Sequence, residues 1–194
     1  MPQMTFATLR LLLAILYRAY AVYAAQIEDP RLARAFWRGL WSRGRFDMQE
    51  ITPYLEAHRD GFYLIDPARP FFQTANLVYT EKAEKEYGPI AELMPDVPKP
   101  DKHLFSMRSP EGSSSLSMEE AARYLVLAQA YDIAGIRTPV VGNTHANKGK
   151  VYAPKGAVGT GWCGAIGGTF LEGSSLFETL LLNFALFDTR NDNG

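Results

Sequence analysis

Apolar side chains near the N-terminus repeat at intervals of three and four residues, which is the spacing of one helical face. The repeating positions are Leu9, Leu12, Leu13, Leu16, Tyr20 and Tyr23. Arg10 and Arg18 interrupt this run, whereas a membrane-spanning helix needs roughly 20 mostly apolar residues. The pattern therefore predicts a helix buried in a protein core, and no membrane partner.

The next apolar stripe belongs to a helix that is expected to begin after an N-cap at Asp29 and to end near Ser42. Pro30 suits its first position, where a missing backbone N–H is tolerated. The expected apolar face contains Phe36, Trp37, Leu40 and Trp41. Another face carries Arg31, Arg34 and Arg38. We interpret this arginine face as solvated, with phosphate binding as the alternative.

Short elements are expected after this helix. Asp47 with Glu50 signals a further helix start, which Pro53 kinks or restarts. The apolar residues 62–65 predict a short strand, and residues 81–86 a solvated helix end or loop. The three prolines Pro95, Pro98 and Pro100 predict an extended linker over residues 95–101. Residues 103–108 are expected to form a second strand, and residues 111–115 a loop.

Two capping boxes mark the later helices. Ser117 with Glu120 precedes a central helix that is expected to stop at Gly135, and Ser175 with Glu178 precedes the last helix. The expected buried stripe of the last helix is Leu176, Leu180, Leu181, Phe184 and Phe187. Between these helices, residues 135–173 are rich in glycine and show no sustained apolar period. A loop of this length in a compact domain favours a functional role.

These elements predict an α+β fold that is mostly helical, with a few short strands and long glycine-rich loops. The 194 residues are expected to form one domain, with a possible linker near residues 95–101. The formal net charge is −1, so any contact with nucleic acid must be local rather than a property of the whole chain. The single cysteine predicts a reducing compartment, the cytoplasm.

The sequence gives little support for catalysis. The histidines, at positions 58, 103 and 145, lack the spacing of metal ligands relative to one another or to Cys163. A lone cysteine among glycines is typical of a packing residue, and the glycines near it do not match a phosphate-binding Walker loop. We therefore expect no enzyme activity, no cofactor and no metal. A small hydrolase that uses Cys163 as its nucleophile is the remaining catalytic alternative.

Short motifs follow one another in an order that resembles the N-terminal region of the CasA family. The first part of the chain contributes residues 11–19, the tryptophans Trp37 and Trp41, residues 44–46 and the signature Pro70-Phe71-Phe72-Gln73. The second part contributes residues 120–125, 129–132, 134–136, 159–162, 167–168 and 178–183. Each motif is short, so the resemblance depends on their order and spacing from residue 9 to residue 183.

CasA is the large subunit of the type I-E CRISPR surveillance complex, called Cascade. The resemblance implies a non-catalytic subunit that works in antiviral defence beside subunits holding the guide RNA. It would recognise the protospacer-adjacent motif, a short tag in double-stranded target DNA, and help recruit a helicase-nuclease. Family members also have strands before the first core helix and a C-terminal helical bundle. We therefore expect this chain to be truncated at both ends, with an abbreviated relative of the family as the alternative.

Two loops would read the tag by this resemblance. The first corresponds to residues 104–107, and its candidates are Phe105, Ser106, Met107 and the adjacent Arg108. The second lies between residues 141 and 161, and its candidates are Gly142, Asn143, Lys155 and Gly156. Glycine allows the backbone to approach a minor groove closely, while asparagine and lysine can contact base acceptors or phosphates. The alternatives are an edge strand at the first loop and a scaffold module that touches no DNA.

Overall fold

The computed structural model describes residues 1–27, 29–85, 88–95, 97, 114–132, 135–152 and 161–186. The chain divides into two compact units. One contains residues 4–59 and the described residues from Gly168 onward, and we call it the helical unit. The other contains residues 60–167, and we call it the loop unit. The predicted strand at residues 103–108 lies outside the described residues, as does most of the predicted linker.

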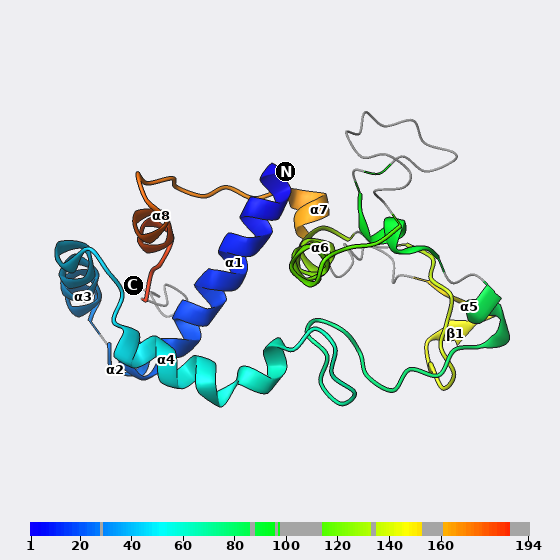
Figure 1. Cartoon of the computed structure of the whole chain (residues 1–194). Coiled ribbons are helices and arrows are strands. Elements are labelled where there is room, and N and C mark those ends of the chain that lie inside the picture. Colours follow the sequence, from blue (N-terminus) through cyan, green and yellow to red (C-terminus); the bar gives the residue numbers. More distant parts are fainter. Residues whose placement is uncertain are drawn as a thin grey trace. The chain divides into compact units, whose positions relative to one another are not determined.

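The helical unit is built from five helices, and all of them except α2 contribute residues to one core (Figure 1). They are α1 (Pro2–Ala19), α2 (Ala21–Gln26), α3 (Pro30–Arg43), α4 (Met48–Ala57) and α8 (Leu176–Leu182). The buried core residues are Leu9, Leu16, Tyr20, Leu40, Leu180, Leu181 and Phe184. The apolar stripes predicted for the first and last helices thus supply most of this core.

Tyr20 lies at the centre of the core and is 1% exposed. Its ring lies 5.6 Å from that of Phe36 and 5.8 Å from that of Phe184, while its hydroxyl accepts a 2.8 Å hydrogen bond from the Asp47 backbone N–H. Burial raises the pKa of Tyr20 above its usual value, so the phenol stays neutral. One side chain therefore joins the end of α1 to the start of α4.

Three residues predicted for apolar faces are exposed instead. α1 ends at Ala19 and α2 begins at Ala21, so the apolar face of α1 does not extend to Tyr23. Tyr23 is therefore 37% exposed. Trp41 is 42% exposed and stacks on Trp37 with a ring separation of 5.2 Å. Leu176 is 59% exposed because it is the first residue of α8, and the buried residues of this helix begin one turn later.

Capping interactions define the helix starts as the sequence predicts. The Asp29 carboxylate accepts from the Arg31 N–H at 2.7 Å, and the Asp47 carboxylate accepts from the Gln49 N–H at 3.0 Å. Pro53 lies inside α4, and the helix continues through it to Ala57. Trp37 joins α3 to α8, because its indole N–H donates a 2.8 Å hydrogen bond to the carbonyl of Leu181.

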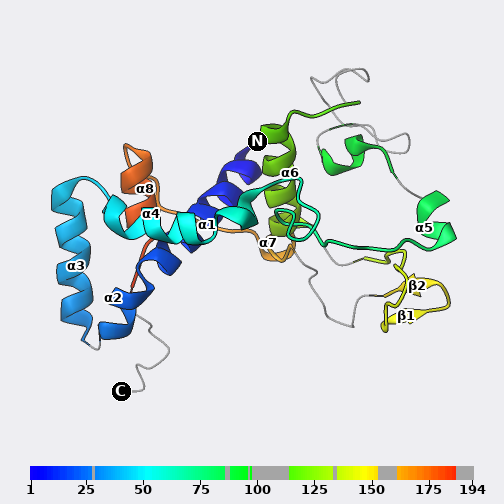
Figure 2. The same cartoon turned by 60° about the horizontal axis from the view of Figure 1, so that its bottom comes forward.

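The loop unit contains one longer helix and several short elements (Figure 2). They are α5 (Glu81–Lys85), α6 (Met118–Tyr131), α7 (Cys163–Ile166), the 3₁₀ turn η2 (Ile90–Leu93) and the strands β1 (Ala146–Asn147) and β2 (Lys150–Val151). The turn η1 (Arg59–Phe62) leads into this unit from α4. The fold is α+β and mostly helical, as predicted.

The central helix α6 begins with the predicted capping box, in which Ser117 and Glu120 exchange hydrogen bonds of 3.3 Å. Its end was predicted wrongly, because the helix stops at Tyr131 with Asp132 as C-cap rather than at Gly135. Gly161 packs against this end: a Cβ there would lie 2.0 Å from the backbone nitrogen of Asp132. The α6 terminus is therefore enclosed by backbone from the glycine-rich region.

The predicted strand at residues 62–65 is wrong. Phe62 belongs to η1, and the backbone that follows bonds to a loop rather than to a strand. The Tyr63 carbonyl accepts from the Phe71 N–H at 2.8 Å, and the Leu64 carbonyl accepts from the side-chain amide of Gln73 at 2.8 Å. Residues 135–173 were also predicted to lack regular structure, whereas they include β1, β2 and α7.

Candidate nucleic-acid interface

Of the residues predicted to read DNA, Gly142 and Asn143 lie in the described structure, next to each other on the loop unit. The Asn143 N–H donates to the Val140 carbonyl at 3.3 Å, which closes a four-residue turn. Gly142 has a φ of +79° there, with no heavy atom within 4 Å of a hypothetical Cβ. Backbone conformation, rather than crowding, therefore favours glycine at this position.

A second turn follows directly. The side-chain Oδ1 of Asn143 accepts from the His145 N–H at 2.9 Å, and the Asn143 carbonyl accepts from the Ala146 N–H at 3.2 Å. This is the local bonding by which asparagine stabilises turns. The acceptor Oδ1 is engaged inside the turn. The Nδ2 amide is the donor of the Asn143 side chain, and through it Asn143 can bind a ligand.

The segment ends in a two-residue hairpin. Ala146 pairs with Val151 and Asn147 pairs with Lys150 in antiparallel register. Lys148 and Gly149 connect these strands with φ values of +49° and +70°. Positive φ at both central positions is the backbone requirement of a type I′ hairpin turn. We call residues 140–151, with their three successive turns, the turn–hairpin segment.

Neighbouring backbone holds the base of this segment. Arg137 and Val151 exchange backbone hydrogen bonds of 2.9 and 2.8 Å, and the Val141 N–H donates to the Val78 carbonyl at 2.9 Å. The Thr80 hydroxyl adds a 3.3 Å bond to the Pro139 carbonyl. Figure 2 shows the β1–β2 hairpin with α5 next to it, as this pairing requires. The tip of the segment is thus carried on a fixed base.

The charge in this stretch of sequence has one sign, whereas the neighbouring helix α5 carries both signs, with Glu81 and Glu84 beside its lysines. No aspartate or glutamate occurs between Asp132 and Glu172 in the sequence, whereas this interval contains Arg137, Lys148, Lys150 and Lys155. Arg137 is neutralised locally, because its guanidinium pairs with the Asp132 carboxylate at 2.8 Å. Lys148 and Lys150 are exposed, as is His145. The described face therefore offers two lysines, a histidine and turn backbone to an anionic partner.

The sequence candidates divide into two groups in the structure. Gly142 and Asn143 lie side by side in the turn–hairpin segment, which is exposed along most of its length. The other candidates lie outside the described residues: Phe105, Ser106, Met107, Arg108, Lys155 and Gly156. Lys148 and Lys150 were not among the candidates. The run without acidic residues is the signal in the sequence that could have identified them.

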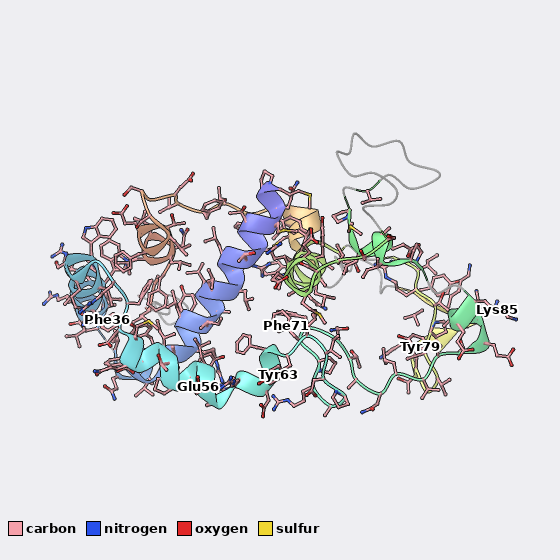
Figure 3. The ribbon with its side chains drawn as sticks, viewed as in Figure 1. Phe36, Glu56, Tyr63, Phe71, Tyr79 and Lys85 are labelled. Carbon is pink, nitrogen blue, oxygen red and sulfur yellow. The ribbon has the colours of Figure 1, made fainter. Side chains whose placement is uncertain are left out.

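The Pro-Phe-Phe-Gln signature forms a structural corner. Phe72 adopts a φ of +53°, which is unusual for an aromatic residue, and its carbonyl accepts from the Gln129 side-chain amide of α6 at 3.4 Å. The ring of Phe71 lies 6.0 Å from that of Phe62. Figure 3 shows Phe71 next to Tyr63, to which its backbone is hydrogen-bonded. The signature thus fixes the turn that leads from η1 toward α6.

The described residues offer little for metal or nucleophilic chemistry. Within them, no group of three histidine, cysteine, aspartate or glutamate side chains could hold a metal ion. Cys163 is 6% exposed and lies in α7, which packs against α6, in agreement with a packing role. No helix in the described ranges has the length and apolar character needed to cross a bilayer.

Comparisons with known proteins agree on one family. The model of the CRISPR-associated protein Cse1 family matches residues 1–193. A curated relative, CRISPR-associated protein CasA/Cse1 of Thermus thermophilus, is 30% identical over 187 residues, which are 94% of this chain and 32% of the relative.

Two solved structures show the same likeness. Thermobifida fusca Cse1 has a TM-score of 0.75 and 38% identity, with 98% of this chain and 33% of that chain covered. Thermus thermophilus CasA (Cse1) has a TM-score of 0.60 and 26% identity, with 98% and 34% covered. The chain spans about a third of the length of these relatives. This chain belongs to the CRISPR-associated protein Cse1 family.

Proposed function

We propose that this chain is part of the large subunit of the Cascade surveillance complex, and that its turn–hairpin segment contacts double-stranded target DNA at the protospacer-adjacent motif. The observation that carries the proposal is the combination of exposed cations and tight turns in a stretch of sequence without any acidic residue. Family membership supplies the context, since the relatives are named CRISPR-associated proteins.

The chemistry of the segment suits a minor groove. The turn at Gly142 has no side chain that would keep the backbone away from the floor of the groove. The Nδ2 amide of Asn143 can donate to the acceptors that every base pair presents there. Lys148 and Lys150 extend from the hairpin and can neutralise the flanking phosphates. Such contacts discriminate bases weakly, which suits a protein whose sequence specificity comes from guide pairing.

The wider role follows from the same proposal. The chain would work beside the subunits that carry the guide RNA, and would help recruit the helicase-nuclease once the tag is bound. It would have no catalytic role of its own, and it would act in the cytoplasm, where invading DNA meets the complex. Residues 105–108 and Lys155 with Gly156 would complete the reading surface.

The first test removes the two hairpin lysines without disturbing the turn. The double substitution Lys148→Asn with Lys150→Gln removes both charges. Asparagine tolerates the positive φ at position 148, next to Gly149, so the turn is kept. In the assembled complex, we expect binding of tagged duplex to weaken by about tenfold, or about 1.4 kcal/mol, because the two lysines reach the flanking phosphates only when the turn is seated in the groove of the tag. Titration with tagged and untagged duplexes measures this change.

The matched control is Arg18→Gln with Arg123→Gln, which removes the same charge from exposed positions on α1 and α6. The control should leave the ratio of tagged to untagged affinity unchanged, while the hairpin variant should lower it. Equal ratios for the wild type and the hairpin variant would contradict the proposal.

A scaffold role is the second candidate, and one observation favours it. Large apolar side chains surround the turn–hairpin segment on the surface. Val78 is 63% exposed, Ile136 57%, Val141 59% and Tyr152 49%. An exposed apolar patch is typical of a protein contact. In that case the segment packs on a neighbouring subunit, and the hairpin variant should assemble poorly into the complex while its affinity for DNA is unchanged.

A further inference from the structure

The strongest charge concentration in the chain lies in the helical unit, away from the turn–hairpin segment in sequence. Residues 31–45 contain five arginines and no acidic residue, although the whole chain has a net charge of −1. All five side chains are exposed. They are Arg31, Arg34, Arg38, Arg43 and Arg45. The function proposed above makes no use of them.

Three of these arginines form a continuous face of α3. At 3.6 residues per turn, Arg31, Arg34 and Arg38 fall within about 60° of arc and extend over about 10 Å of the helix axis. The opposite face carries Leu40, which is fully buried, and Trp37, whose indole is bonded to α8, lies on the flank between the two faces. In both Figure 1 and Figure 2, the other elements of the helical unit lie on one side of α3. We call these three residues the arginine face.

Small residues leave the arginine face open. Ala35 and Gly39 are exposed beside the arginines on the helix, and a hypothetical Cβ at Gly39 would have no heavy atom within 4 Å. Within the described residues, no carboxylate is recorded in an ion pair with any of the three guanidinium groups. A flat or extended partner can therefore reach all three of them.

A purely solvated face explains this composition poorly. Like charges at spacings of three and four residues destabilise a helix, by roughly 0.2–0.5 kcal/mol per pair, and Arg31 sits unfavourably in the positive first turn. Lysine would solvate the surface as well as arginine, yet every lysine in the chain lies at position 82 or later. Arginine differs in having a planar fork that binds phosphate oxygens through paired hydrogen bonds.

We propose that Arg31, Arg34 and Arg38 bind the sugar–phosphate backbone of double-stranded DNA, at a contact separate from the turn–hairpin segment. A single strand would also need aromatic platforms for its bases. The nearest tryptophans stack on each other, with Trp41 and Trp37 only 15° from parallel, so one face of each ring is already covered. The convex, arginine-lined helix fits a duplex backbone that is held by charge and carries no sequence information.

Salt dependence gives the sharpest test, because each phosphate contact contributes about 0.9 to the slope of log affinity against log salt concentration. The probe is a fluorescent 30-base-pair duplex without a tag, titrated with the full chain. We expect Arg31→Gln with Arg34→Gln and Arg38→Gln to reduce this slope by about 2.7, which is three phosphate contacts. The corresponding lysine variant should keep the slope and bind more weakly than the wild type, since charge remains and the fork is lost.

The control removes three exposed arginines from scattered sites, by Arg18→Gln, Arg69→Gln and Arg123→Gln. Because its net charge equals that of the test variant, a general charge effect would lower both slopes equally and would overturn the proposal. So would a wild-type chain that fails to bind the duplex at low salt, or one that binds RNA or an acidic peptide more tightly through the same arginines. Melting curves should show every variant folded, and the glutamine variant of the arginine face should melt at or slightly above the wild-type temperature, because like-charge repulsion within α3 is removed.

The two proposals fail separately. Loss of the arginine face should weaken tagged and untagged duplex by the same factor, because a backbone contact is independent of the tag. Loss of the hairpin lysines should lower the ratio between the two. A hairpin variant without effect, together with an arginine variant of lower slope, would reject only the tag-reading role.

Discussion

At the scale of single residues, close packing of the backbone and local hydrogen bonds determine parts of the structure that sequence patterns do not predict. Gly161 is one example, because its role depends on the end of α6, some 30 positions earlier, coming within contact distance. Phe72 is another, held at positive φ in a motif that resembles an ordinary turn. By contrast, the capping roles of Asp29 and Ser117 were predictable, since a cap depends on neighbours two or three residues away.

A glycine substitution tests the packing at the end of α6. In Gly161→Ala, the new methyl group would meet the Asp132 nitrogen and the Tyr131 backbone, neither of which is the flexible end of a side chain. We expect a loss of about 1–3 kcal/mol in the free energy of unfolding, the usual effect of overpacking. Urea denaturation followed by circular dichroism measures it.

Gly39→Ala is the matched control, since Gly39 is exposed in α3 and has open space around it. It should stabilise the protein by up to about 1 kcal/mol, because alanine is the better helix former. Equal effects of the two substitutions would contradict the packing role of Gly161.

At the scale of elements, the sequence predicted helices better than strands. The helices are defined by caps and by apolar spacing, both of which are local, so α3, α4, α6 and α8 begin where expected. The β1–β2 hairpin was missed because each strand has only two residues and its register depends on the turn at Lys148 and Gly149. Residues 62–65 have strand-like composition, but the side chain of Gln73 takes the place of a partner strand.

The start of α8 provides a prediction on pH. Hydrogen bonds from the Ser174 hydroxyl and the Ser174 N–H, the latter at 2.7 Å, hold the pKa of Glu178 below its usual value of 4.5. A lowered pKa in the folded state stabilises the protein at pH above the unfolded pKa, and this stabilisation is lost as the pH falls through the folded value. We therefore expect Glu178→Gln to reduce the urea midpoint at pH 7 and to have a smaller effect near pH 3.

Glu172→Gln is the control for this measurement, because it removes an exposed carboxylate from the same segment. Its effect on the urea midpoint should be small at both pH values. If the difference between wild type and Glu178→Gln were the same at pH 7 and pH 3, the carboxylate would not be the source of the stabilisation.

At the scale of the whole molecule, the sequence predicted the fold class and the family, while the DNA-reading loops stay a prediction, of whose candidates only Gly142 and Asn143 lie in the described residues. The motifs that carry the resemblance follow one another in order, and they include helix faces and fixed corners such as Pro70–Gln73. Single cations on loops carry no such pattern, so Lys148 and Lys150 were missed, although the surrounding run without acidic residues could have pointed to them. The overall charge of −1 conceals two positive regions, at residues 31–45 and 133–171.

Site-specific photo-crosslinking in the assembled complex tests the central claim most directly. A photoreactive residue would replace Thr144, which is exposed in the turn–hairpin segment, and Ile65, which is 76% exposed elsewhere in the loop unit, would serve as the control position. We predict crosslinks from position 144 to duplex DNA that depend on the tag, and none to DNA from position 65. Crosslinks from position 144 to protein subunits alone would contradict the account and favour a scaffold role.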